Sequence, residues 1–166
     1  GAQGKAAKIA GAVAIIAEVD RSRIETRFEQ GWVDVVAYTP YEAFQKAREA
    51  QNNHEALAIA YLGNIVEVWE KFDEAEIFID LGSDQTSLHN PWAGGYYPVD
   101  ISFEEANKMM AENPTLFKEK VQETLRRHAK AINKHTEKGT YFFDYGNAFL
   151  LEASRAGADV MNPNKE

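Results

Sequence analysis

The run Val13-Ala14-Ile15-Ile16-Ala17-Glu18 consists of five apolar residues followed by a single carboxylate. A continuous apolar run of this length is typical of a parallel strand that is buried on both faces. Residues 1–11, which contain three glycines, precede it and indicate a turn that enters a short helix. Folds that bind dinucleotides place an acidic residue about 20 positions after such a turn, where its carboxylate accepts the ribose hydroxyls. Glu18 lies near that distance, so the run favours a nucleotide-binding α/β fold.

Other interpretations of this region stay open. A carboxylate at a strand end can also favour the start of the next helix, although Asp20 is the better candidate for that cap. Arg21 and Arg23 lie near the expected ribose and could accept a 2′-phosphate, so the residues alone do not choose between NAD and NADP. A dinucleotide fold normally has a strand before its glycine turn. We see none here, and we expect the first strand of the sheet to be missing.

The rest of the chain alternates between segments of strand character and segments of helix character. Predicted helices begin at clear capping signals, such as Thr39 before Pro40 and Ser102 before Glu105. We therefore expect a Rossmann-like α/β fold: a mostly parallel open sheet with helices on both faces, in one domain over residues 1–166, with residues 99–139 as a helical excursion. The further strands are predicted at residues 32–37, 57–62, 77–81 and 140–144, and the helices at 21–30, 39–53, from 64, 102–113, 114–138 and 148–156.

Polar and aromatic side chains follow the carboxyl ends of several predicted strands, which is where open α/β sheets bind ligands. The segment 82–98 after the strand at 77–81 is the richest in them and also has two tyrosines that could cover a flat ligand. A solvated turn is the other interpretation of this segment. We expect Glu18, Asn64, His89 and Tyr145 to converge on one groove, although Asn64 could instead cap a helix.

Several segments, spread over nearly the whole chain, resemble those of a known family. Gln85-Thr86-Ser87-Leu88-His89, with Gly95-Tyr96-Tyr97-Pro98 after it, closely resembles the NAD-contacting segment of urocanases, and residues 143–153 resemble a second signature of that family. Residues 1–7 and 17–20 match in order and spacing. The resemblance implies an NAD-binding domain whose cofactor contacts are Glu18, Arg23, Asn64, Ile65, Gln85, Thr86, Ser87, Leu88, His89, Tyr96, Tyr97 and Tyr145.

The resemblance also implies a reaction. Urocanases add water to urocanate to give 4-imidazolone-5-propionate in histidine degradation, with tightly held NAD⁺ as an electrophile. The family's active-site cysteine lies in a flanking region, and this chain has no cysteine. We therefore expect a lyase as the parent protein, a dimeric intact enzyme, and little or no activity or NAD binding by these 166 residues alone. A dehydrogenase domain that uses NAD for hydride transfer and a nucleotide-sensing or oligomer-forming module are the alternatives.

Composition excludes several other classes. The net charge of −8 lacks the clustered basic face of a nucleic-acid-binding protein, and no apolar run is long enough to cross a membrane. We see no signal peptide and expect a cytoplasmic protein. His128 and His135 fall seven apart on a predicted helix, but no third ligand is evident. We interpret both as surface or packing residues and expect no metal site.

Overall fold

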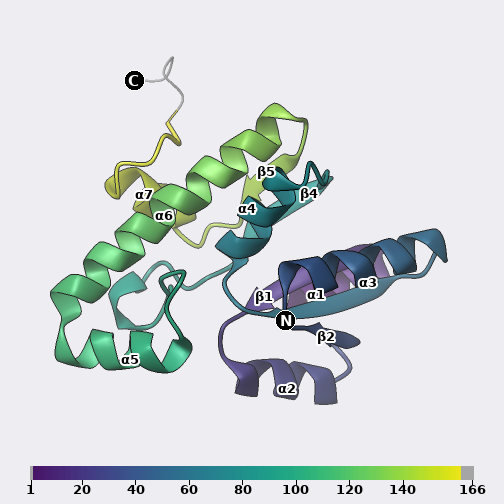
Figure 1. Ribbon diagram of the computed structural model, residues 1–166, viewed down its shortest axis with the longest axis horizontal. Helices are drawn as coiled ribbons and strands as arrows, with labels where there is room; N and C mark the ends of the chain where they lie inside the picture. The colour runs from purple at the N-terminus through teal and green to yellow at the C-terminus, as the bar shows by residue number, and fades with distance from the viewer. Residues whose placement is uncertain (1, 162–166) are drawn as a thin grey trace. The chain divides into compact units, whose positions relative to one another are not determined.

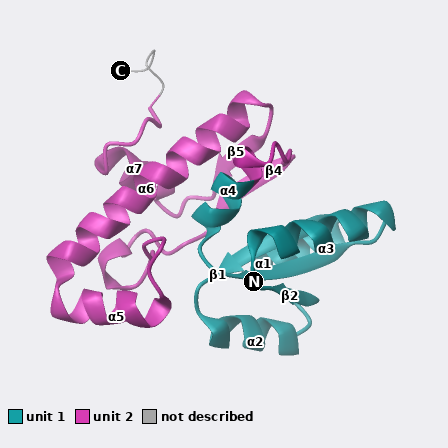
Figure 2. Cartoon of the chain, in the orientation of Figure 1, with its two compact units in different colours: residues 1–71 teal, residues 72–166 magenta. Residues whose placement is uncertain are grey.

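The computed structural model describes residues 2–161 of the chain. These residues form parallel strands with helices between them (Figure 1). The chain divides into two compact units, residues 1–71 and residues 72–166 (Figure 2). In the described part, every helix is too short or too polar to cross a membrane.

The first unit is built on a three-stranded parallel sheet in the order β1-β3-β2. The strands are β1 (Val13–Glu18), β2 (Val35–Ala37) and β3 (Leu57–Leu62). The central strand β3 is the most buried of the three, and the side chains of Ala58 and Ile59 are fully covered. This burial on both faces explains why the sequence of β3 is an unbroken apolar run.

Helices cover both faces of this sheet, as predicted. Ile24 of α2 (Arg21–Glu29) packs in one cluster with Ala60, whereas Ala43 of α3 (Pro40–Asn52) packs in another with Ile59. Because successive strand residues point to opposite faces, α2 and α3 must lie on opposite sides of the sheet, which Figure 1 also shows. The remaining helices are α1 (Ala2–Ile9) and α4 (Ile65–Glu74), and α4 crosses the boundary between the units.

The second unit contains a parallel pair of strands, β4 (Leu81–Asp84) and β5 (Tyr141–Asp144). Between them lie α5 (Phe103–Glu112) and the long helix α6 (Pro114–Glu137), and α7 (Phe149–Arg155) follows β5. A short 3₁₀ helix spans Pro91–Ala93. Five side chains spaced along α6 are buried in the core of the second unit: Phe117, Val121, Leu125, His128 and Ile132.

The single sheet expected from the sequence is replaced by two sheets in the described residues. The strand predicted at residues 77–81 is also wrong, because pairing begins only at Leu81. The reason lies at the end of α4, where Glu76 adopts φ 55° and Ile77 donates its N–H to the Phe72 carbonyl oxygen at 2.8 Å. This is the hydrogen bond that closes a helix end, so Ile77 terminates α4 and does not start a strand.

The strand predicted at residues 32–37 is shorter than expected and begins at Val35. Asp34 explains the difference, because its Oδ2 accepts the N–H of Ala58 at 2.9 Å. The Asp34 side chain therefore binds the Ala58 N–H, which a main-chain carbonyl oxygen would accept if β2 began earlier.

Candidate functional site

Glu18 is the last residue of β1, and its carboxylate is held at the carboxyl end of the first sheet. Its Oε1 accepts the N–H of Asp20 at 3.1 Å, and its Oε2 lies 3.9 Å from Nη1 of Arg23. Arg23 Nε also lies 3.4 Å from Oδ2 of Asp20. Asp20 caps α2, as predicted, by accepting from the N–H of Ser22, and the Ser22 hydroxyl lowers the pKa of its carboxyl. The Glu18 side chain remains 30% exposed and is accessible to a ligand.

Asn64 lies beside Glu18 in the first unit, because Gly63 donates its N–H to the Glu18 carbonyl oxygen at 3.1 Å. The helix-capping role is confirmed: Asn64 Oδ1 accepts from the N–H of Val66 at 3.1 Å. Glu67 Oε2 accepts both the Asn64 N–H and the Tyr61 hydroxyl, the latter at 2.6 Å. Burial, and then this hydrogen bond, raise the pKa of Tyr61 well above its usual value.

Ile65 begins α4 directly after Asn64 and is partly buried. The structure thus brings together four of the predicted contacts within the first unit: Glu18, Arg23, Asn64 and Ile65.

The second unit brings together three other predicted residues in a small pocket of about 220 Å³. Gln85 and His89 come from the loop after β4, whereas Tyr145 begins the turn after β5. Both segments leave the carboxyl ends of parallel strands that pair Asp84 with Asp144. Gly146 and Asn147 complete the lining of the pocket. Of the four residues expected to share one groove, His89 and Tyr145 line this pocket, and a groove that also includes Glu18 and Asn64 stays a prediction.

A buried polar pair beneath this pocket was not among the predicted contacts. Asp84 is 4% exposed and Asn147 is 8% exposed, and Asn147 Nδ2 donates to Asp84 Oδ1 at 2.6 Å. The N–H and the hydroxyl of Thr86 donate to the same Asp84 oxygen, at 3.0 and 2.5 Å. The Thr86 hydroxyl therefore points at Asp84 and does not face the pocket. An aspartate two residues before a threonine is a known turn pattern, and it is the one sequence signal for this pair.

Two predicted contacts, Leu88 and Tyr96, have side chains that a ligand cannot reach. Leu88 is fully buried, and Tyr96 is 3% exposed. The Tyr96 hydroxyl lies 2.9 Å from Nδ1 of His128, and burial raises the pKa of Tyr96 well above its usual value. For these side chains the prediction of direct cofactor contact differs from the structure, because they form part of the core of the second unit.

Tyr97 is partly buried, and a contact of its ring with a flat ligand stays a prediction. Its hydroxyl donates to Asn107 Oδ1 at 2.8 Å, and its ring lies 5.0 Å from that of Phe103. Both partners belong to α5, so Tyr97 packs the loop onto this helix. Ser87, in contrast, is exposed in the loop, and its N–H donates to the Gly95 carbonyl oxygen at 3.0 Å.

The loop is compact, and its glycines are not simply flexible. A Cβ on Gly95 would lie 2.1 Å from the Ser87 carbonyl oxygen and 2.5 Å from that of Asn90. Only glycine allows the two arms of the loop to approach this closely. The segment is folded upon itself, while Gln85, Ser87 and His89 within it are exposed to solvent.

His128 and His135 are confirmed as packing residues. Both are almost fully buried on α6, and the His128 ring makes an edge contact with Phe149 at 4.8 Å between centroids. Within residues 2–161, no group of three or more ligand-type side chains is placed to hold a metal ion.

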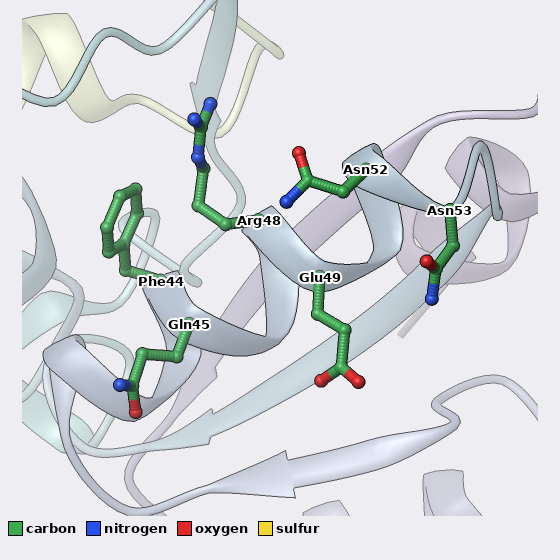
Figure 3. Close-up of a pocket in the computed structure, with 6 residues that line it drawn as sticks. All are labelled: Phe44, Gln45, Arg48, Glu49, Asn52 and Asn53. Carbon is green, nitrogen blue, oxygen red and sulfur yellow. The ribbon is translucent and has the colours of Figure 1, made fainter.

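A larger hollow of about 620 Å³ lies on α3 in the first unit and is not a candidate site. Figure 3 shows its lining side chains along this one helix and at its end, where Asn53 is the C-cap. The hollow is an open helix face, and it lies away from the carboxyl ends of the strands where ligands of α/β sheets bind. None of its lining residues is a predicted contact: Phe44, Gln45, Arg48, Glu49, Asn52 and Asn53.

Comparison with known proteins agrees with this arrangement. Residues 1–165 match the model of the urocanase Rossmann-like domain. The chain is 52% identical over 165 residues to urocanate hydratase of Homo sapiens, covering 96% of this chain and 24% of that protein. It is 53% identical over 167 residues to a probable urocanate hydratase of Dictyostelium discoideum, covering 100% of this chain and 25% of that protein. The chain thus spans about a quarter of the length of these curated relatives. It belongs to the urocanase family and corresponds to its Rossmann-like domain.

Proposed function

We propose that this chain is the NAD-binding domain of a urocanate hydratase. The relatives named urocanate hydratase support the hydration of urocanate as the activity of the whole protein, in preference to the dehydrogenase alternative. The observation that carries the cofactor proposal is the pocket in which Gln85, His89 and Tyr145 meet.

The pocket fits one end of a dinucleotide. Its volume of about 220 Å³ is below the roughly 300–1,000 Å³ that encloses a drug-sized ligand, so it suits a single ring or phosphate. Gln85 offers an amide, His89 an imidazole and Tyr145 a phenol, which together can donate to and accept from a carboxamide such as that of nicotinamide. Ser87 adds an exposed hydroxyl in the same loop.

Glu18 fits the adenosine ribose. Its carboxylate lies at the carboxyl end of a parallel strand and is partly exposed, as the ribose hydroxyls require. Arg23 is drawn to the carboxylates of Glu18 and Asp20, which leaves it poorly placed to bind a 2′-phosphate. The negative charge of Glu18 also repels such a phosphate. Both features favour NAD over NADP.

The role of these side chains is to bind and orient. When bound, NAD⁺ supplies an electron-poor ring that can act as an electrophile. In the first unit, Glu18 and Asn64 offer groups suited to an adenosine ribose, and in the second unit Gln85, Ser87 and His89 offer groups suited to a nicotinamide carboxamide or a phosphate. We further propose that catalysis requires parts of the enzyme besides this chain, and that the intact enzyme is a cytoplasmic homodimer.

Titration of the ¹⁵N-labelled chain with NAD⁺ tests the proposal by NMR, a method that detects even millimolar binding. Amide resonances of Glu18 and Asn64 in the first unit, and of residues 85–89 and 145–147 in the second, should shift, and NADP⁺ should shift those of the first unit less. Shifts confined to the α3 hollow would refute the cofactor assignment.

A further inference from the structure

We propose that Asp84 and Asn147 are positioning residues that hold the two walls of the pocket in register, an inference that rests on the proposed binding of NAD⁺. Asp84 is the last residue of β4, and Asn147 follows β5 in the turn that begins with Tyr145. The 2.6 Å hydrogen bond between their side chains therefore joins the two loops that line the pocket.

Asn147 bridges three segments with one amide. Its Nδ2 donates to Asp84 Oδ1 and also to the main-chain carbonyl oxygen of Thr86 at 3.0 Å. Its Oδ1 accepts the N–H of Phe149, the first residue of α7, at 3.3 Å. The loop after β4, the turn after β5 and the start of α7 are thus connected through this side chain.

Asp84 fixes the start of the loop after β4. Its Oδ1 accepts from Asn147 and twice from Thr86, so three donors converge on one oxygen. Gln85 lies between these two anchored residues and is exposed. Anchoring of both neighbours restrains the backbone at Gln85 before a ligand arrives, which reduces the entropy lost on binding.

The turn after β5 is held in an unusual conformation. Ala148 has φ 69°, a left-handed value that an alanine rarely adopts, and Gly146 has φ 77°. Asp144, the residue before Tyr145, accepts the N–H of Gly146 through Oδ1 at 2.9 Å. Strained backbone persists only where the surroundings over-determine it, and it concentrates at ligand sites. The bonds made by Asp144 and Asn147 provide that restraint and direct Tyr145 toward the pocket.

Asn147→Ser separates positioning from local folding. A serine hydroxyl can still accept the N–H of Phe149 in a similar turn, but it is too short to reach Asp84. Asp84→Asn is the conservative counterpart, because its amide oxygen can keep the bonds that Oδ1 accepts while the charge is removed. Asn133→Ser is the matched control: it removes a 2.7 Å bond from Asn133 Nδ2 to the Asp159 carbonyl oxygen in the same unit, away from the pocket.

The experiment compares the dissociation constants of NAD⁺ and AMP, measured by NMR titration of the full 166-residue chain. AMP carries the adenosine end alone. We expect Asn147→Ser to weaken NAD⁺ binding roughly tenfold, the usual effect of losing one buried hydrogen bond, and to leave AMP binding within about twofold. Asp84→Asn should retain most of the NAD⁺ affinity, and Asn133→Ser should change neither constant.

The possible failures can be told apart. If NAD⁺ shifts amide resonances of the unmodified chain only outside the pocket, the proposed function fails and this inference falls with it. If the unmodified chain binds NAD⁺ and Asn147→Ser binds it equally well, only the positioning role is refuted. If Asn147→Ser weakens NAD⁺ and AMP equally, the bridge is merely structural, and that result too overturns the inference. Amide spectra of each free variant establish that it is folded before the titration.

Discussion

Replacing Glu18 by glutamine should change which nucleotide the chain prefers. The substitution keeps the size of the side chain and one acceptor oxygen, and it removes the negative charge. In the structure Glu18 Oε1 accepts one amide at 3.1 Å, so the second oxygen, which faces Arg23 at 3.9 Å, is the one available to a ribose hydroxyl. Glutamine has a single oxygen for both tasks and must give up one of them.

The size of the effect follows from these contacts. A hydrogen bond to a charged acceptor contributes roughly 1.5–3 kcal/mol, so losing one should weaken NAD⁺ binding about tenfold or more. Removal of the carboxylate also abolishes its repulsion of a 2′-phosphate, worth about 1–2 kcal/mol near the surface. Arg23 loses one of its two carboxylate neighbours and becomes available to the phosphate. Together these changes should reduce the preference for NAD⁺ over NADP⁺ roughly a hundredfold.

Titrations of NAD⁺, NADP⁺ and AMP into the Glu18→Gln chain measure this change. AMP should weaken by the same factor as NAD⁺, because the contact is to the adenosine ribose that both share. Glu29→Gln is the control, since Glu29 is an exposed glutamate at the end of α2 in the same unit and its loss changes the net charge equally. An unchanged ratio of NAD⁺ to NADP⁺ affinity, or a ratio that shifts equally in both variants, would refute the assignment of Glu18 to the ribose.

Three further predictions concern stability. Asp73→Asn should lower the free energy of unfolding at pH 7 by about 1 kcal/mol, because Lys134 and Lys138 both donate to this carboxylate at 2.6 Å from exposed positions. These two bonds lower the pKa of the Asp73 carboxyl from 3.8 to about 2. Their contribution to the free energy of unfolding is therefore present above about pH 4 and disappears as the pH falls toward 2. Urea unfolding should show that the difference in free energy between the unmodified chain and Asp73→Asn becomes smaller across that range. Gly95→Ala should lower the free energy of unfolding by at least about 2 kcal/mol in the same assay, because the new Cβ would collide with two main-chain carbonyl oxygens that cannot both move. A loss below about 0.5 kcal/mol, which is typical of an ordinary surface change, would contradict the loop geometry. Ala148→Gly should instead raise the melting temperature by a few degrees, because glycine relieves a left-handed conformation that costs alanine roughly 1 kcal/mol; a lower melting temperature would show that Ala148 is not strained.

The helices were the most predictable part of the fold, because the residues that cap their ends lie close together in the sequence. Thr39 accepts the N–H of Glu42 at 3.0 Å, and Ser102 and Glu105 form the reciprocal pair of a capping box. Both patterns are readable within four residues of sequence. The prediction of a strand at residues 77–81 was wrong because this structure is not decided by local sequence. Whether Ile77 pairs with a neighbour or closes α4 depends on how the preceding helix ends, and an apolar run does not carry that information.

The site was predictable in composition but not in which side chains face outward. Sequence reasoning found the loop after β4 and the turn after β5, and the structure confirms that Gln85, His89 and Tyr145 meet. It could not find that Tyr96 and Leu88 belong to the core, because burial of Tyr96 depends on His128, which lies 32 residues away. Contacts of this range follow from tertiary packing and leave no local pattern.

Exposure along residues 85–89 nevertheless alternates, and this alternation explains how one short segment can serve both pocket and core. Gln85, Ser87 and His89 are exposed, whereas Thr86 is partly buried and Leu88 is fully buried. The segment is turned, because Leu88 donates its N–H to the Thr86 carbonyl oxygen and Asn90 donates to that of Ser87, both at 3.0 Å. The inward side chains hold the segment through Asp84 and the core, and the outward ones are thereby presented to the pocket. A change at Leu88 should therefore disturb the pocket as much as a change at His89, although only the latter side chain is within reach of a ligand.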